Sequence, residues 1–185
     1  MNAESVKKLR TRFRGDILEP GDLAYESARK VYNAMFDRHP LLIARCADAA
    51  DVIAAVRFAG DRDFPVSIRG GGHHTAGLGV CDDGLVIDLS RMKHCRVDPE
   101  AGTARVTGGC TWGDVDHATH AFGMATPSGF ISTTGVGGLT LGGGIGYLSR
   151  KYGLTIDNLL EADVVLADGS FVTASRKQQP ELFWA

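Results

Sequence analysis

The chain has 185 residues, of which 44% are hydrophobic, and its 20 Lys and Arg against 22 Asp and Glu give a formal net charge of −2. This length and composition fit one domain, or one domain with a small appendage, and exclude an intrinsically disordered chain. The charge argues against nucleic-acid binding, and no stretch reaches the roughly 18 apolar residues that a membrane-spanning helix requires.

Residues 1–38 are expected to form a polar and partly helical segment ahead of a domain over 39–185. A turn signal, Glu19-Pro20-Gly21-Asp22, precedes a predicted helix over about 23–36. His39-Pro40 ends this helix, because the residue before a proline disfavours the helical backbone conformation.

A βαβ unit is predicted next. Apolar strands at 41–46 and 64–68 flank a helix over 47–61, with Asp48 as its N-cap. One side of this helix is apolar, and Asp51 lies away from that side. A strand, helix and strand of this combined length form a parallel pair.

The second half of the chain adds hairpins and helices, whose antiparallel pairing makes the sheets mixed. In chain order, the expected elements are a strand at 85–90, a hairpin around 98–102, a helix from Thr111 to about Gly123 with Asp114 in a capping box, a hairpin around Asp168-Gly169, and the start of a helix at 180–185. We expect the chain to stop inside a larger domain.

His117 and His120 lie on the helix expected from Thr111, at a spacing that metal ligands also use. They fall opposite the apolar stripe that includes Trp112, and no third ligand is near. A solvated polar helix face is the prediction, and no metal is expected.

The four cysteines form no CxxC pair, and the basic N-terminus has no apolar core after it. This pattern indicates neither a zinc site nor a redox dithiol nor a secretory signal. It predicts reduced, packed thiols in a cytoplasmic protein.

Glycine is the outlier of the composition: most of the 24 glycines fall between Gly70 and Gly146. The first cluster runs from Arg69 to Gly77, directly after the predicted strand at 64–68, where open α/β sheets place their ligands. Glycines allow close approach of the backbone, and successive amides form a concavity that binds anions. A flexible surface loop is the alternative interpretation.

Residues 124–146 form a second glycine-rich element, which is long for a loop and therefore expected to be functional. The hydroxyl side chains of Ser132, Thr133 and Thr134 stand directly ahead of the glycines that begin at Gly135. Hydroxyl groups and backbone amides together can bind pyrophosphate. The chain contains no Gly-Lys pair, which excludes a P-loop. The Rossmann glycine spacing fails from Gly70, Gly135 and Gly142, which disfavours an NAD-binding Rossmann enzyme.

In their order along the chain, these motifs resemble the flavin-linked oxidases of the berberine-bridge-enzyme type, within the vanillyl-alcohol oxidase and p-cresol methylhydroxylase fold group. The resemblance runs from about Gly21 to the last residue. The matching stretches are Pro20-Gly21-Asp22 with Tyr25, then 68–77, 86–91, 135–138 with 142–146, 152–158 and 164–169.

The resemblance implies an α+β FAD-binding domain of the p-cresol methylhydroxylase type, with two small mixed sheets and flanking helices around FAD. It also implies that His73 bonds covalently to the flavin 8α-methyl group; a non-covalent contact is the alternative. The implied cofactor-binding residues are Arg69, Gly70, Gly71, Gly72, His73, His74, Gly77, Ser132, Thr133, Thr134, Gly135, Gly137, Gly138, Gly143, Gly146 and Val164.

Many members of the family carry a second tether, a cysteine at the position that Ile131 occupies here. We therefore expect attachment through histidine alone. Thr134 stands where the family's residue influences oxygen access, and it is polar where a small apolar residue is more usual. The electron acceptor can therefore be oxygen or another compound, and both alternatives stay open.

The family implies oxidation of a small organic substrate by hydride transfer to the flavin. Its catalytic bases, its substrate domain and a piece that completes the flavin domain are expected outside these 185 residues, so no catalytic residue is assigned. The pattern indicates neither the substrate nor the oligomeric state. The alternative is a truncated, non-catalytic FAD-binding or interaction module.

Overall fold

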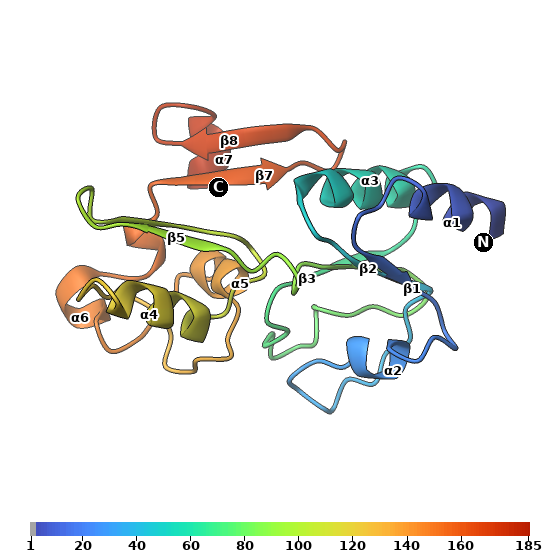
Figure 1. Ribbon diagram of the computed structural model, residues 1–185, viewed down its shortest axis with the longest axis horizontal. Helices are drawn as coiled ribbons and strands as arrows, with labels where there is room; N and C mark the ends of the chain where they lie inside the picture. Colours follow the sequence, from blue (N-terminus) through green and yellow to red (C-terminus); the bar gives the residue numbers. More distant parts are fainter. Residues whose placement is uncertain (1–2) are drawn as a thin grey trace.

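The computed structural model describes residues 3–185, which form three small sheets with helices around them (Figure 1). The strands are β1 (Asp16–Leu18), β2 (Leu42–Arg45), β3 (Val66–Arg69), β4 (Leu85–Asp88), β5 (Cys95–Asp98), β6 (Thr103–Val106), β7 (Glu161–Val165) and β8 (Phe171–Ser175). The helices are α1 (Ala3–Arg10), α2 (Tyr25–Ala28), α3 (Ala49–Gly60), α4 (Trp112–His120), α5 (Val136–Leu141), α6 (Ser149–Tyr152), the 3₁₀ helix η1 (Ile156–Asn158) and α7 (Pro180–Trp184).

The largest sheet has the strand order β1-β2-β4-β3. Strand β4 pairs in parallel with both neighbours, Val86 lying opposite Ile43 and also opposite Ser67, while β1 runs antiparallel to β2. The predicted βαβ unit is present, but its two strands are not directly paired, because β4 inserts between them. All four residues of β4 are buried, as expected for a central parallel strand covered on both faces.

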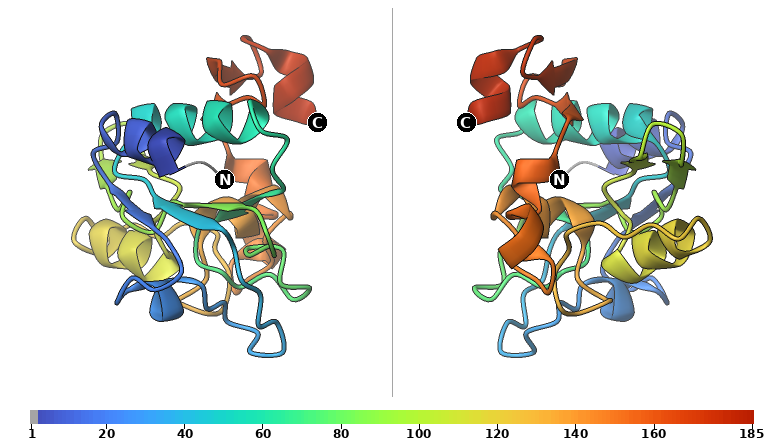
Figure 2. Two further views of the ribbon diagram at one scale, coloured as in Figure 1. Left: turned by 90° about the vertical axis from the view of Figure 1, so that its right-hand side faces the viewer. Right: turned by 90° about the vertical axis from the view of Figure 1, so that its left-hand side faces the viewer.

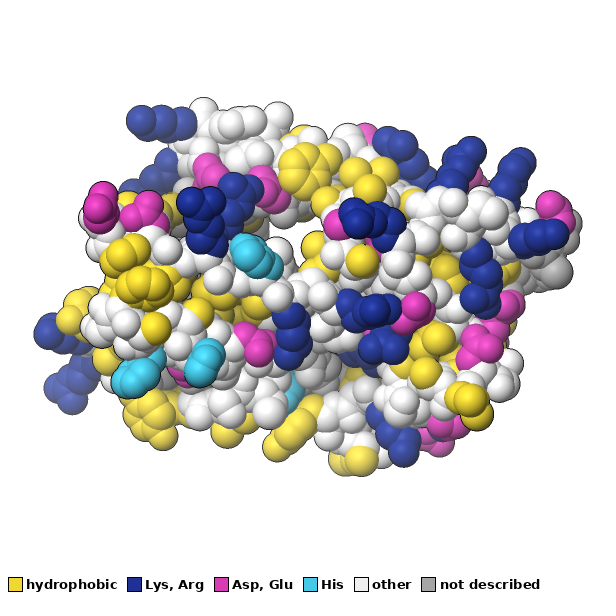
Figure 3. Space-filling model, viewed as in Figure 1, with side chains coloured by type: hydrophobic (Ala, Val, Ile, Leu, Met, Phe, Trp, Pro, Cys, Tyr) yellow, Lys and Arg dark blue, Asp and Glu magenta, His cyan; other side chains and the backbone are white. Residues whose placement is uncertain are grey.

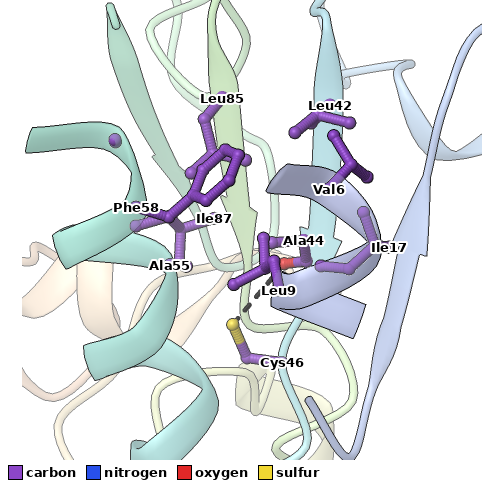
Figure 4. Packing of buried hydrophobic residues seen from close by; sticks show 11 residues of the cluster. Val6, Leu9, Ile17, Leu42, Ala44, Cys46, Ala55, Phe58, Leu85 and Ile87 are labelled. Carbon is purple, nitrogen blue, oxygen red and sulfur yellow. Dashed lines mark hydrogen bonds between the residues drawn. The ribbon is translucent and has the colours of Figure 1, made fainter. Parts of the chain in front are cut away.

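Helices α1 and α3 cover one face of this sheet (Figures 1 and 4). The buried cluster below them contains Val6, Leu9, Ile17, Leu42, Ala44, Cys46, Ala55, Phe58, Ala59, Leu85 and Ile87. Each large apolar side chain removed from water there contributes about 1.5–3 kcal/mol to folding. Residues of α1 and β1 thus share a core with the strands that follow them in sequence.

The predicted helix over about 23–36 is wrong beyond Ala28. Only α2 is helical, and the chain after it is irregular, leaving Met35 exposed. The Tyr32 N–H donates to the Gly72 carbonyl at 3.0 Å, and the Asn33 amide donates to the Thr75 carbonyl at 2.8 Å. Hydrogen bonds to the first glycine loop therefore replace the hydrogen bonds that a helix would make.

The side of α3 that faces the core includes Asp51, contrary to the prediction. Asp51 is fully buried, and its carboxylate accepts the N–H groups of Arg14, Gly15 and Ala47, each at 2.9 Å. The carboxylate thus ties the segment before β1 to the start of α3. The predicted N-cap is confirmed, since Asp48 accepts the N–H groups of the first turn.

Both predicted hairpins are confirmed: β5 pairs with β6 and β7 with β8, each antiparallel. They form two-stranded sheets of their own, so the mixed pairing lies within the four-stranded sheet. The β7–β8 hairpin lies next to α3 (Figures 1 and 2), where Arg57 donates to the Gly169 carbonyl at 3.1 Å.

The predicted capping box is confirmed at α4, where Asp114 accepts the Thr111 N–H at 2.8 Å. His117 and His120 are exposed, as predicted for a solvated face. Helix α5 lies inside the stretch that was predicted as loop. Its Leu139 packs against the cluster around Trp112, so tertiary packing stabilises a helix despite two glycines.

Residues 1–38 were expected to be partly helical, but the sequence assigned no range to α1, and it did not predict β1, α6 or η1. Within residues 3–185, none of the helices has the length and hydropathy that crossing a membrane demands.

Candidate functional site

The first glycine loop leaves the carboxyl end of β3 and is anchored there by Arg69. The guanidinium donates from Nη2 to Asp88 at 2.7 Å, and from Nη1 to the carbonyls of Ala28 and Lys30. Arg69 was predicted to bind the cofactor. Its guanidinium contacts these protein groups and thereby joins the loop to β4 and to the end of α2.

The two predicted glycine loops meet backbone to backbone. A Cβ atom on Gly71 would lie 2.3 Å from the Gly135 nitrogen, and one on Gly135 would lie 2.2 Å from the Gly71 nitrogen. Neither position accepts a side chain. Within residues 3–185 neither N–H group donates a hydrogen bond, so both are left to bind an anion.

A third glycine segment, Gly108-Gly109, adjoins the first two and was missed. A Cβ on Gly70 would lie 3.1 Å from the Gly108 carbonyl oxygen, and one on Gly137 would lie 3.8 Å from it. The glycine pair follows β6 after one residue, Thr107, and that position near a strand end was the signal in the sequence.

His73 lies where the two predicted loops converge. Its Nε2 is 3.0 Å from Oγ1 of Thr133 and its Nδ1 is 3.4 Å from Oγ1 of Thr134. The ring stacks on Tyr32 with centroids 4.0 Å apart and planes at 18°. Burial lowers the pKa of His73, which keeps the imidazole neutral near pH 7.

His74 has different surroundings. It is exposed, and its Nδ1 accepts the Ala76 N–H at 3.1 Å within the same turn. Tyr32 was missed as a site residue, because no motif distinguishes it from other exposed tyrosines. Only the folded chain brings it to His73.

A cavity of about 260 Å³ lies beside the first glycine loop. Lys30 and Lys93 bring positive charge to its wall, and Ser27, Ser90, Thr111 and Thr133 bring hydroxyls. Its lining is Ser27, Lys30, Val31, Tyr32, Arg69, Gly70, Gly71, Gly72, Ser90, Lys93, Gly109, Thr111 and Thr133. The predicted site contained only Arg69, the three glycines and Thr133 of this set.

A wider hollow of about 400 Å³ lies against α4, lined by Lys93, Cys95, Cys110, Gly113, Asp114 and His117. It contains no residue of either predicted glycine loop. Lys93 belongs to both hollows and forms an ion pair with Asp114 at 3.0 Å.

Other predicted residues have contacts away from His73. A Cβ on Gly77 would lie 2.3 Å from the Phe36 ring, and one on Gly146 would lie 1.6 Å from the Ser128 carbonyl oxygen. Gly143 adopts φ +98°, which suits a tight turn. Val164 lies in β7 opposite Val172.

Two further predicted residues belong to the second loop. The carbonyl of Ser132 accepts the Gly113 N–H at 2.8 Å. Gly138 lies in α5, and a Cβ there would meet nothing within 4 Å.

Large apolar side chains around the second glycine loop are exposed. Phe130 and Tyr147 form a T-shaped pair at 4.9 Å, and Ile131, Leu141 and Ile145 are also exposed. Figure 3 shows apolar side chains on the left of the view, around α4, with histidine side chains among them. Ile131 presents no sulfur at the position of the second tether.

Residues 40–175 match the family described as FAD binding domain. (R)-6-hydroxynicotine oxidase from Paenarthrobacter nicotinovorans is 38% identical over 172 residues, covering 93% of this chain and 38% of the relative. The FAD-linked oxidoreductase pgmH of Aspergillus terreus is 37% identical over 188 residues, covering 100% of this chain and 38% of the relative. The chain therefore spans a little over a third of the length of these curated relatives.

Comparison with solved structures points to the same kind of protein. The crystal structure of 6-hydroxy-D-nicotine oxidase from Arthrobacter nicotinovorans matches with a TM-score of 0.92 at 38% identity, covering 94% of this chain and 38% of that one. BBE-like 1 from Physcomitrella patens matches with a TM-score of 0.92 at 33% identity, covering 97% and 40%.

With its glycine loops, its unpartnered amides and this similarity, the chain belongs to the family of FAD-binding domains. The predicted α+β flavin-binding fold and the resemblance to flavin-linked oxidases of the berberine-bridge-enzyme type are confirmed.

Proposed function

We propose that this chain is the FAD-binding portion of an oxidoreductase that holds its flavin covalently through His73 and oxidises a small organic molecule. The observation that carries the proposal is the placement of His73 at the junction of the two glycine loops, with a half-buried, neutral ring. The named activities of the relatives support it, since they include oxidation of 6-hydroxynicotine and of a xylooligosaccharide.

The residues at the site fit the parts of FAD. The N–H groups of Gly71 and Gly135 would hold the negatively charged pyrophosphate, and no Cβ atom would keep it away. Lys30 on the adjoining cavity wall would offset the negative charge, whereas Lys93 already pairs with Asp114 at 3.0 Å. Bound FAD supplies the hydride acceptor, while the protein positions it.

His73 is the attachment point in this proposal. A neutral imidazole carries one nitrogen lone pair, which makes it a nucleophile near pH 7. Ile131 lacks the sulfur that a thioether requires, so attachment is through His73 alone. No catalytic base is assigned within the chain.

The test compares His73→Ala with the matched control His74→Ala after expression with FAD. We expect a yellow precipitate after acid denaturation of the parent protein and of His74→Ala, with intact masses raised by one FAD. His73→Ala should release its flavin into the supernatant. Retention of flavin by His73→Ala would rule out the tether, and a colourless parent protein would rule out flavin binding by this chain.

That last outcome favours the second candidate, a non-catalytic module. Its motivation is that the chain covers 38% of its curated relatives and exposes several large apolar side chains. A cytoplasmic location and the division of the chain near residue 38 stay predictions.

A further inference from the structure

The side chain of Tyr32 lies flat against the imidazole of His73. The two ring centroids are 4.0 Å apart and the ring planes differ by 18°, which is a stacked arrangement. Tyr32 is 69% exposed, whereas His73 is only partly exposed. The tyrosine ring therefore stands between water and one face of the histidine ring.

Hydrogen bonds hold the backbone at Tyr32 in this place independently of its ring. The Tyr32 N–H donates to the Gly72 carbonyl at 3.0 Å, and the Asn33 side-chain amide donates to the Thr75 carbonyl at 2.8 Å. The two acceptors lie just before His73 and two residues after it. A substitution of the Tyr32 side chain should thus remove the ring contact while the segment stays attached to the first glycine loop.

The groups at the edge of the imidazole do not fix its plane in the same way. Oγ1 of Thr133 lies 3.0 Å from Nε2, and Oγ1 of Thr134 lies 3.4 Å from Nδ1. A hydroxyl can donate or accept and rotates to suit its partner, so these contacts satisfy either neutral form of the ring. Rotation about the bond to a histidine ring is broad, and an aromatic ring packed on its face restricts that rotation. The orientation of the imidazole plane therefore depends on Tyr32.

The cover over the ring also affects its charge. Burial lowers the pKa of His73 below the ordinary 6.5, because the imidazolium loses hydration. The charged side chains on the adjoining cavity wall are those of Lys30, Arg69 and Lys93, which are all cations, so this wall offers the imidazolium no counter-ion. His74, the next titratable group along the loop, is exposed. The covered ring is thus held in its neutral form.

We propose that Tyr32 is a positioning residue that orients the His73 imidazole and shields it from water for its bond to the flavin. This inference rests on the proposed covalent role of His73. In the overall attachment reaction, one methyl C–H bond of the flavin and the imidazole N–H bond are replaced by a C–N bond. Two protons and two electrons leave, and dioxygen accepts them as hydrogen peroxide. Tyr32 takes no part in these bonds and acts through His73.

The first experiment measures the pKa of His73 in the flavin-free chain by NMR titration, with its ring signals assigned by their loss in His73→Ala. We expect a pKa below 6.5 in the parent protein and in Tyr32→Phe, which keeps a flat ring in the same place. Tyr32→Ala uncovers the imidazole, so the pKa of His73 should rise toward 6.5. Met35→Ala, an exposed side chain of the same segment, is the matched control and should leave this pKa unchanged. An equal pKa in the parent protein and in Tyr32→Ala overturns the proposal.

The second experiment measures the rate at which flavin becomes resistant to acid release. At about pH 8, where the imidazole is neutral in every variant, Tyr32→Ala should lower this rate about 2- to 10-fold, the scale of one aromatic stacking contact. On acidification, attachment should begin to slow at a higher pH in Tyr32→Ala than in the parent protein. Tyr32→Phe and Met35→Ala should follow the parent protein in both respects. Equal slowing in Tyr32→Phe and Tyr32→Ala overturns the proposal, because the stacked ring would then not be the group that matters.

The two experiments separate this inference from the proposed function. A parent protein that never attaches flavin contradicts the proposed covalent role of His73. An unchanged pKa of His73 in Tyr32→Ala contradicts the role of Tyr32, and that measurement requires no flavin.

Discussion

Nη2 of Arg69 lies 2.7 Å from Oδ2 of Asp88, and both side chains are buried. The two residues are register partners at the carboxyl ends of β3 and β4. Asp88 also accepts the Ser90 N–H at 2.9 Å, while Arg69 reaches back to the end of α2. One ion pair thus fixes the point from which the first glycine loop departs.

Removing the cation of this ion pair should destabilise the folded protein. Arg69→Met leaves the Asp88 carboxylate buried with the Ser90 N–H and the more distant Arg45 guanidinium at 3.8 Å, and should lower the free energy of unfolding by about 3–5 kcal/mol. Urea denaturation measures the change. Arg14→Met is the control, because that guanidinium is 80% exposed beside Asp48 and should contribute less than about 1 kcal/mol. Similar losses of stability in both variants would mean that the buried ion pair contributes no more to folding than the exposed one.

Gly71→Ala should disrupt the contact between the loops. Its Cβ would overlap the Gly135 backbone, and overpacking of this kind costs about 1–3 kcal/mol. Gly138→Ala should instead be neutral or stabilising by about 0.5–1 kcal/mol, since that helical glycine has free space around it. Thermal unfolding and flavin retention are measured together. Gly71→Ala retaining full flavin binding would contradict the proposed pyrophosphate site.

Asp51→Asn should weaken the N-terminal attachment. One of the three N–H groups that the carboxylate accepts would face an amide NH₂, leaving buried donors unpaired at a cost of about 1–3 kcal/mol. Asp61→Asn on the exposed end of the same helix is the control and should have almost no effect. Hydrogen exchange of Arg14 and Gly15 amides should accelerate only in Asp51→Asn.

Asp114, in the capping box of α4, should make the stability of the folded protein depend on pH in the acid range. Burial alone would raise its pKa, but hydrogen bonds from Thr111 and Lys93 hold the pKa below the ordinary 3.8. The folded state therefore binds fewer protons than the unfolded one, so this stabilisation is present above about pH 4 and is lost as the pH falls through the lowered pKa. In Asp114→Asn, the stability measured by urea denaturation should fall less steeply below pH 4. An unchanged slope would contradict the assignment.

Local signals in the sequence predicted much of the fold. The N-cap at Asp48, the capping box at Thr111 and the turn at Asp168-Gly169 each depend on residues a few positions apart, and all are confirmed. The convergence of His73 with the second loop followed from resemblance to a family, and the structure shows the contact with Thr133.

Features that depend on distant partners were missed. The chain after Ala28 is not helical because its backbone bonds to the glycine loop. Asp51 is buried where it accepts two distant N–H groups, those of Arg14 and Gly15, beside the nearby one of Ala47. Tyr32 reaches His73 only in the folded chain. Periodicity and propensity describe neighbours in sequence, so they carry no information about these pairings.

The contact between Gly71 and Gly135 joins segments far apart in the chain, with β4, the β5–β6 hairpin and α4 between them. Contacts of large sequence separation require a costly loop closure and form late in folding. The amides proposed to hold the pyrophosphate therefore come together only in molecules that have closed this long loop. Capture of a flavin at His73 would then mark those molecules that have completed folding, and the bound cofactor would keep them folded by mass action.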